Sequence, residues 1–355
     1  VQLVAGAEIQ TGDITTRDTL TDPPPRTAPF FDDPPANARH TEDLDHASVY
    51  AYATWQLNEA LTLQGGLTYD WLRYPENYRT SPITPGDEHR DDLSFKGGLL
   101  WQPCNTLSFW SAYAESVGGI TFEESISLEP SQTVGMLHNF RSVISESLVG
   151  SLSAPEHEIA GAGISWQAGD DLYLDLGYRW RSADVDRLRG AFTRRGPPPL
   201  YPEPTPEALD YDEHQIGDKL TWLLGNQCAG SLGYAWTHAE LDQEFTEFPA
   251  TGGVPAGYSL ESDFHEVEAR LLWNHPSGFF GEASSRFLSQ NNSTFSDEND
   301  LNVDLAAGYA PTGQGGRFRL GVLNATDSSY DLNPLTDRSV PVTDRTFFLE
   351  YVFTY

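Results

Sequence analysis

Hydrophobic and polar residues alternate one by one in short segments along most of the chain. The clearest segment is the C-terminal TDRTFFLEYVFTY, in which Phe347, Leu349, Tyr351, Phe353 and Tyr355 share one face. Strict alternation is typical of a β-strand, because successive side chains point to opposite faces of a sheet. The apolar face is rich in aromatic residues and reaches the last residue. This favours a strand whose outer face meets lipid, with a strand of a soluble β-sandwich as the alternative.

Segments of this kind recur and predict fourteen strands. They cover residues 1–10, 47–57, 61–69, 93–101, 107–113, 160–166, 172–180, 216–224, 232–236, 267–273, 279–287, 301–309, 318–322 and 343–355. Between them, short turns alternate with long connections rich in charge or proline, predicted as loops over 11–45, 73–90, 116–155, 184–212, 239–261, 290–300 and 326–342. A soluble sandwich gives no reason for that alternation, whereas a membrane barrel does.

The fold class predicted is therefore all-β: a transmembrane antiparallel up-and-down β-barrel of about fourteen strands. The segment Gln132–His138 inside the third long connection could add a strand pair and raise the number to sixteen. Residues 1–355 are expected to form a single barrel domain. Val1 already stands in a strand pattern, so we expect a periplasmic domain upstream of it. No apolar run is long enough for a transmembrane helix, and the mean hydropathy is −0.44.

Tryptophans recur at equivalent places in the predicted barrel. Five of them end a descending apolar series just before a short turn: Trp55, Trp101, Trp166, Trp222 and Trp273. An indole ring suits the boundary between lipid and water, because its body is apolar and its N–H is polar. We expect these residues to form a girdle at the periplasmic membrane interface. The alternative is ordinary core tryptophan at strand ends.

The positions between the apolar ones carry charge, which assigns them to the lumen because a charge at the lipid face is costly. The lumen-lining candidates are Asp171, Tyr173, Asp175, Arg179, Glu266, Glu268, Arg270, Glu282, Arg286, Asp304, Arg319 and Glu350. Acids and arginines on neighbouring strands could brace the wall as ion pairs, or they could form a charged path for a solute. Tyr173, Trp110 and Tyr52 are expected to face inward, where they could stack on sugar rings.

Charge and motif content narrow the function. The chain has 52 acidic and 21 basic residues and a formal net charge of −31, which argues against a nucleic-acid partner. The acidity indicates either a solvated, repulsive surface or a lumen that attracts cations, and we expect an acidic lumen. No nucleophile motif, phosphate loop or dinucleotide fingerprint occurs, so we predict no enzyme, no catalytic residue and no cofactor. No metal site is predicted, although Asp297–Asp300 could hold Ca²⁺. Cys104 and Cys228 are expected to be free thiols.

Several motifs resemble known families. Ser94–Gly118, Leu128–Thr133 and Gly321–Tyr330 resemble segments of the C-terminal barrel of TonB-dependent receptors. The last motif departs from that pattern at Ala325 and Thr326. The stretch LEPSQTVGMLHNFRSVISESLVG looks more like barrels fused behind tetratricopeptide repeats, a resemblance that implies an exopolysaccharide exporter with a periplasmic helical scaffold.

These patterns lead to a passive outer-membrane channel that exports a polysaccharide or another polar solute. A plug-less receptor barrel for ligand uptake and a barrel that anchors a partner are the alternatives. The expected location is the bacterial outer membrane. The expected partners are outer-membrane lipid or lipopolysaccharide, a periplasmic tetratricopeptide scaffold and a polysaccharide cargo.

Overall fold

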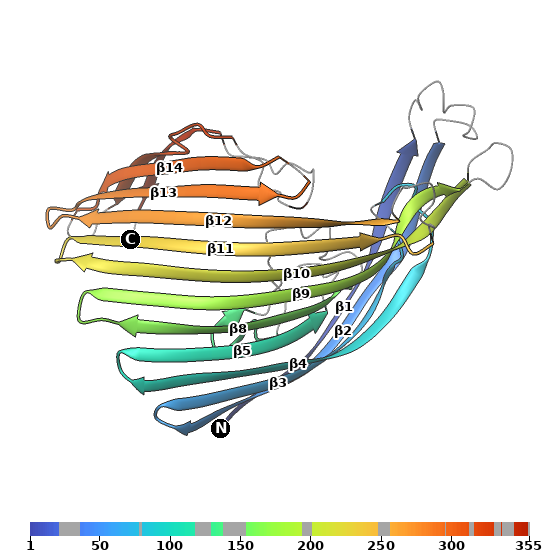
Figure 1. Ribbon diagram of the computed structural model, residues 1–355, viewed down its shortest axis with the longest axis horizontal. Coiled ribbons are helices and arrows are strands. Elements are labelled where there is room, and N and C mark those ends of the chain that lie inside the picture. The colour runs from blue at the N-terminus through green and yellow to red at the C-terminus, as the bar shows by residue number, and fades with distance from the viewer. Residues whose placement is uncertain are drawn as a thin grey trace.

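The computed structural model describes residues 1–20, 36–77, 80–117, 129–137, 154–193, 201–247, 256–294, 296–311, 316–329, 335 and 344–353. They form one curved antiparallel sheet of 14 strands, in the order β1-β2-β3-β4-β5-β8-β9-β10-β11-β12-β13-β14-β15-β16 (Figure 1). Every strand pairs with its neighbour in the chain, apart from the short hairpin that separates β5 from β8. The predicted up-and-down topology is therefore confirmed.

The strands vary in length from 7 to 24 residues. Their bounds are β1 (Gln2–Leu20), β2 (Ala36–Asn58), β3 (Leu61–Pro75), β4 (Asp87–Cys104), β5 (Leu107–Val117), β8 (Glu156–Gln167), β9 (Leu172–Thr193), β10 (Tyr201–Leu224), β11 (Cys228–Glu244), β12 (Gly257–Asn274), β13 (Phe279–Asn292), β14 (Glu298–Tyr309), β15 (Arg317–Leu323) and β16 (Thr346–Val352).

Short turns gather at one end of the sheet, which we call the turn end, and longer connections gather at the other, the loop end (Figure 1). The predicted sixteen-strand alternative is wrong. Residues 132–137 do form two short strands, β6 (Gln132–Thr133) and β7 (Met136–Leu137), but these pair only with each other in a separate two-stranded sheet.

The described parts of two predicted long loops, residues 11–20 and 36–45 and residues 184–193 and 201–212, are instead strand. β1 and β2 stay paired from Gln2↔Thr54 to Leu20↔Ala36, and β9 and β10 from Trp222↔Leu172 to Tyr201↔Thr193. Prolines at 202, 204 and 206 are compatible with β10, because β11 pairs with β10 only from Ala208 onward. A proline has no backbone N–H to donate to a neighbouring strand. Prolines at every second position of an unpaired strand edge therefore replace N–H groups that would have no acceptor there.

Side chains alternate between the two faces along each strand. In β3, Leu67 and Tyr69 are 45% and 46% exposed, whereas Thr68 between them is 0% exposed. The same outward exposure of large apolar residues recurs from β1 to β16. Such a continuous apolar exterior is far larger than the patches of soluble monomers and is the pattern of a lipid-facing wall. The described residues contain no helix long and apolar enough to cross a membrane.

Candidate functional site

The inner wall at the turn end carries a row of alternating charges across β12 to β16. Arg270 donates to Glu282 at 2.5 Å, Glu282 also accepts from Arg319 at 3.2 Å, and Arg319 lies 3.7 Å from Glu350. One level higher, Arg286 lies 3.1 Å from Glu266 and 2.7 Å from Glu268. Acids and bases thus neutralise one another along the wall, as the alternation in the sequence predicts. We call these seven residues the charge ladder.

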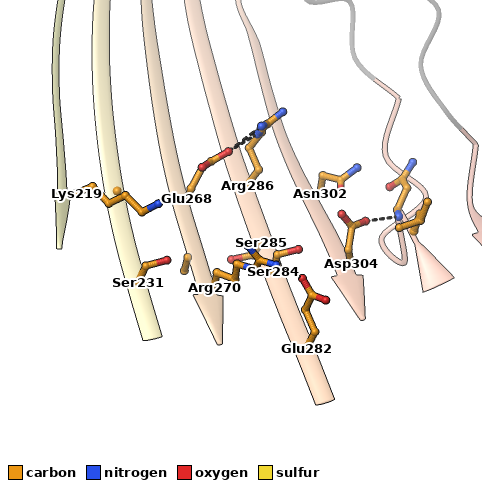
Figure 2. A pocket seen from close by; sticks show the side chains of 14 residues that line it. Lys219, Ser231, Glu268, Arg270, Glu282, Ser284, Ser285, Arg286, Asn302 and Asp304 are labelled. Carbon is orange, nitrogen blue, oxygen red and sulfur yellow. Dashed lines mark hydrogen bonds and ion pairs between the residues drawn. The ribbon is translucent and has the colours of Figure 1, made fainter. Parts of the chain in front are cut away.

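The ladder borders a cavity of about 500 Å³ in the wall (Figure 2). Lys219, Ser231, Ser284 and Asn302 complete its lining, and Asp304 accepts a hydrogen bond from the backbone N–H of Asn324 at 2.8 Å. Hydroxyl and amide groups next to balanced charges make a wet, polar surface rather than a specific ion site.

The remaining lumen candidates lie on or beside the same inner face. Asp175 in β9 accepts from Ser165 Oγ at 2.6 Å, and Tyr173 lies near the turn, where Gln167 Nε2 donates to its hydroxyl at 3.4 Å. Arg179 lines a second cavity, described below. Asp171 lies in the turn before β9, where its carbonyl accepts from Leu223 N. Whether any of them contacts a solute stays a prediction.

The inner wall at the loop end is apolar and packed, which the sequence did not predict. One cluster comprises Ala183, Val185, Leu209, Tyr211, Ala239, Leu241, Leu260 and Leu335, all at most 5% exposed. A second comprises Leu44, Leu72, Tyr74 and Ala154, with Ile14 and Val117 against it. Because Leu335 comes from the β15–β16 connection, part of that connection folds in against β9 to β12. The expectation of a polar inner face therefore holds only toward the turn end.

Two carboxylates are fully buried among these apolar groups. Glu207, whose side chain is 0% exposed, accepts from Arg187 at 2.5 Å and from Arg189 at 2.9 Å, and it also accepts from Gln243. Glu213 pairs with Arg181 and accepts from Tyr211 at 2.6 Å. A buried charge requires such complete pairing, because removing one partner costs about 3–5 kcal/mol.

The β3–β4 connection joins distant strands at the loop end. Asp18 of β1 accepts from Ser81 Oγ at 2.8 Å and from Ile83 N at 3.1 Å. Gly190 N of β9 donates to Thr80 Oγ1 at 3.1 Å, and a Cβ at Gly190 would lie 2.2 Å from the carbonyl oxygen of Thr80. These contacts bridge the mouth of the wall from β1 to β9.

A second internal contact is the β6–β7 hairpin, which lies on the inner face of β3 to β5. Glu129, just before it, accepts from Lys96, Tyr52 and Thr68, and Lys96 is buried. Within the hairpin, Met136 is 2% exposed and packs with Ala112, Ala114 and Ile159.

The hairpin turn is conformationally strained. Val134 and Gly135 have φ of 44° and 92°, and Val134 N donates to Gln64 Oε1 at 2.9 Å. A β-branched residue at positive φ costs on the order of 1–3 kcal/mol, so surrounding contacts must hold it. Gly98 makes room for it, because a Cβ there would lie 2.5 Å from Val134 Cγ2. Residues 129–137 thus form a fitted insert in the wall.

Part of the acidic excess lies outside the lumen. Glu156, Asp184, Asp210 and Asp242 are directly opposite one another on β8 to β11, on the outward face of the loop end. Burial, followed by repulsion from Asp184, Asp242 and Asp212, raises the pKa of Asp210. The prediction of an acidic lumen therefore needs correction: inside the wall carboxylates alternate with cations, whereas this acidic row, in which Arg90 pairs with Glu156, faces outward.

The predicted tryptophans all lie at the turn end of their strands. Trp55, Trp101, Trp166 and Trp273 are 40–47% exposed, and Trp222 is half-buried. Their role as a membrane girdle stays a prediction. Cys104 and Cys228 are free thiols, as expected.

A second aromatic row toward the loop end was missed. On the outward face, Tyr178 stacks on His214 and Tyr234 on His265, both with ring centroids 6.1 Å apart. Trp71 stacks on His89 in the same way at 5.9 Å. Part of the signal was present, since His214 and His265 each lie eight residues before a turn-end tryptophan, Trp222 or Trp273, on the same face of the same strand.

Comparison with known proteins adds to this geometry. The family model for TonB-dependent receptor-like β-barrels matches residues 2–133. The chain is thus similar to a TonB-dependent receptor-like β-barrel. A search of curated proteins finds no match.

Three solved structures share the fold. The copper transporter OprC has a TM-score of 0.62 and 14% identity, covering 99% of this chain and 54% of its own. The FrpB iron transporter from Neisseria meningitidis has a TM-score of 0.58 and 15% identity, and the match covers 88% of this chain and 46% of that protein. The ferric-catecholate import receptor Fiu from K12 E. coli has a TM-score of 0.52 and 16% identity, and the match covers 98% of this chain and 52% of that protein. The chain spans about half the length of these structures, and at such identities the likeness concerns the fold alone.

Proposed function

We propose that this chain forms part of the barrel wall of an outer-membrane transporter of the TonB-dependent receptor type, and that this transporter takes up a polar ligand. The observation that carries the proposal is the division of the inner wall: the turn end is wet and charged, whereas the loop end is packed with apolar side chains and bridged by a connection. A wall closed from within suits gated uptake better than free passage of a polymer. The family match and the fold likeness support the same choice.

The proposal places the protein in the bacterial outer membrane. The exposed apolar exterior would contact acyl chains, and the outward aromatic rows would lie at the two interfaces. Lipid and lipopolysaccharide are then its immediate partners. No covalent chemistry is needed, because weak repeated contacts with the charge ladder would let a ligand enter and leave.

Export of a polysaccharide through a passive channel, with a periplasmic tetratricopeptide scaffold, is the second candidate. The hydrated charge ladder and the inward Trp110 and Tyr173 favour it, since both features suit contact with sugars. The export hypothesis does not explain why the inner wall at the loop end is packed with apolar side chains.

Single-channel recording of the full chain in planar bilayers separates the two. Gated uptake predicts no steady open level, because the packed clusters and the bridged mouth block ion flow. A steady ohmic conductance that added polysaccharide blocks would overturn the uptake proposal and select the exporter.

A further inference from the structure

A second cavity, of about 450 Å³, opens on the inner wall between β5 and β12. Its floor has almost no side chains. In register across neighbouring strands lie Trp110, Gly163, Gly177, Gly217 and Ala235. The cavity is therefore a hollow in the wall, bounded by Trp110 at one side and by the charge ladder at the other.

The glycines of the floor are not explained by backbone conformation or by tight packing. Gly177 and Gly217 are not among the residues at positive φ. A Cβ at Gly177 would meet no atom nearer than 3.9 Å, and one at Gly217 none nearer than 3.7 Å. Ordinary residues would fit there, at the expense of the space above them. What these two glycines provide is the volume of the hollow.

An aromatic ring forms one side of the hollow. Trp110 lines it, and the indole fills the space over its neighbours, since a Cβ at Gly163 would lie 2.4 Å from Trp110 Nε1 and one at Gly161 3.1 Å from the ring. The indole is thus fixed against the wall by glycines that leave room for it. A fixed ring beside open volume is a stacking surface for a flat or ring-shaped ligand.

Two cations at the hollow form no ion pair. Arg179 and Lys219 both line it, and neither forms an ion pair or hydrogen bond through its side chain within the part of the chain that the structure describes, although Lys219 interacts electrostatically with Glu268. Four acidic residues also line the hollow. Asp175 accepts from Ser165 at 2.6 Å, Glu266 and Glu268 pair with Arg286 at 3.1 Å and 2.7 Å, and Asp218 alternates with the inward Gly217 and Lys219 on the outward face. In a chain of net charge −31, unpaired cations facing a cavity are available to an anion.

We propose that this hollow binds a hydroxylated ring that carries an acidic group, that is, an acidic sugar. Its ring would stack on Trp110, its carboxylate would pair with Arg179 and Lys219, and its hydroxyls would donate to the neighbouring carboxylates. The inference deepens the proposed function by naming a ligand class, and it rests on that function only for the direction of transport.

Equilibrium binding to the purified full chain in detergent tests the site, with glucuronic-acid oligosaccharides as probes and neutral glucose oligosaccharides of equal length as the comparison. We expect the acidic probe to bind at least about tenfold more tightly, the scale of one charge-assisted contact. The double variant Arg179→Gln/Lys219→Gln should remove that preference. Gly217→Val should abolish binding of the acidic probe by filling the floor, whereas Gly97→Val, on the outward face, should leave it unchanged.

Equal binding of both probes, an unchanged preference in the double variant, or no effect of Gly217→Val would overturn the site. Circular dichroism of each variant confirms that it is folded, and Arg73→Gln, which removes a cation of β3 away from the hollow, controls for loss of a wall cation in general. These binding measurements do not test transport, so a negative result would overturn the proposed binding site without contradicting the uptake proposal. A steady open conductance together with normal binding would remove the uptake proposal and keep the site.

Discussion

The two ends of the inner wall use the same chemical pairs in opposite surroundings. At the turn end, Glu282 joins Arg270 and Arg319, and the three side chains are 23–53% exposed. At the loop end, Glu207 joins Arg187 and Arg189 with its own side chain 0% exposed. Water screens the first set, so that it contributes little, whereas the carboxylate of Glu207 is shielded from water and depends on its partners. Solvent access, rather than the identity of the residues, therefore decides what an Arg–Glu pair does here.

The largest expected effect comes from breaking a pair at each end. Glu207→Ala removes the carboxylate to which the buried Arg187 donates, so we expect a loss of about 3–5 kcal/mol in the free energy of unfolding. Glu282→Ala leaves Arg270 and Arg319 accessible to water and should cost about 1 kcal/mol or less. Urea unfolding in detergent micelles, followed by tryptophan fluorescence, measures both.

A matched control is Glu207→Gln, which keeps the shape of the side chain and one acceptor oxygen but removes its charge, and which should fall between the two variants. Equal losses for Glu207→Ala and Glu282→Ala would contradict the contrast between the ends.

An intermediate effect is expected from pH at the loop end. His157, which is 3% exposed, pairs with Ala183 of the first apolar cluster, and burial lowers its pKa from 6.5 to about 4. The unfolded chain takes up a proton near pH 6.5 that the folded chain refuses until about pH 4. Stability should therefore fall as pH is lowered through this window, by on the order of 3 kcal/mol.

His157→Gln should flatten the stability profile between these pH values. His89, whose side chain is 57% exposed, supplies the control, since His89→Gln should leave the profile unchanged. A wild-type profile without any loss between pH 6.5 and pH 4 would show that His157 is not held neutral.

The smallest and most local effect concerns the β6–β7 hairpin. Glu129→Gln weakens the contact to the buried Lys96 by about 1.5 kcal/mol, or about tenfold in the population of released hairpin. Met136→Cys in a Cys104→Ser/Cys228→Ser background reports this, because residue 136 is 2% exposed while the hairpin is seated. Maleimide labelling should become about tenfold faster in the Glu129→Gln variant.

The control for the hairpin is Glu158→Gln, which alters another carboxylate that accepts a tyrosine hydrogen bond. Equal labelling rates in all three proteins would mean that Glu129 does not hold the hairpin. Labelling that rises with Glu158→Gln as well would indicate general loosening of the wall.

Much of the fold could be predicted from the pattern of residues. Segments such as 93–101 and 267–273 alternate strictly between apolar and polar residues. This alternation alone predicted that they are strands and which of their side chains face outward. The turn-end position of the tryptophans followed from their place just before short turns, and the inward assignment of the charge-ladder residues followed from their alternation with apolar neighbours.

The loop end could not be predicted in the same way. Prolines at 202, 204 and 206 indicated a loop, yet β10 includes them: β9 pairs with this stretch, and the pairing with β11 on the other side begins only at Ala208. The burial of Glu207 and the seating of the hairpin depend on contacts between segments far apart in the chain, as does the gathering of Arg179, Lys219 and Trp110 at one hollow. The pattern of residues within one strand does not predict such contacts between distant segments.

The sequence by itself determined the strands toward the turn end, their order and which side chains face outward, because each follows from the alternation of neighbours along one strand. Only the tertiary structure decided how far the strands continue toward the loop end, and which inward residues are dry and which are wet. Glu207 is dry because side chains of the neighbouring strands β9 and β11 surround it, and Lys96 is dry because residues 129–137 lie against β3 to β5. Contacts of this kind between segments decide whether water or another side chain meets a given charge.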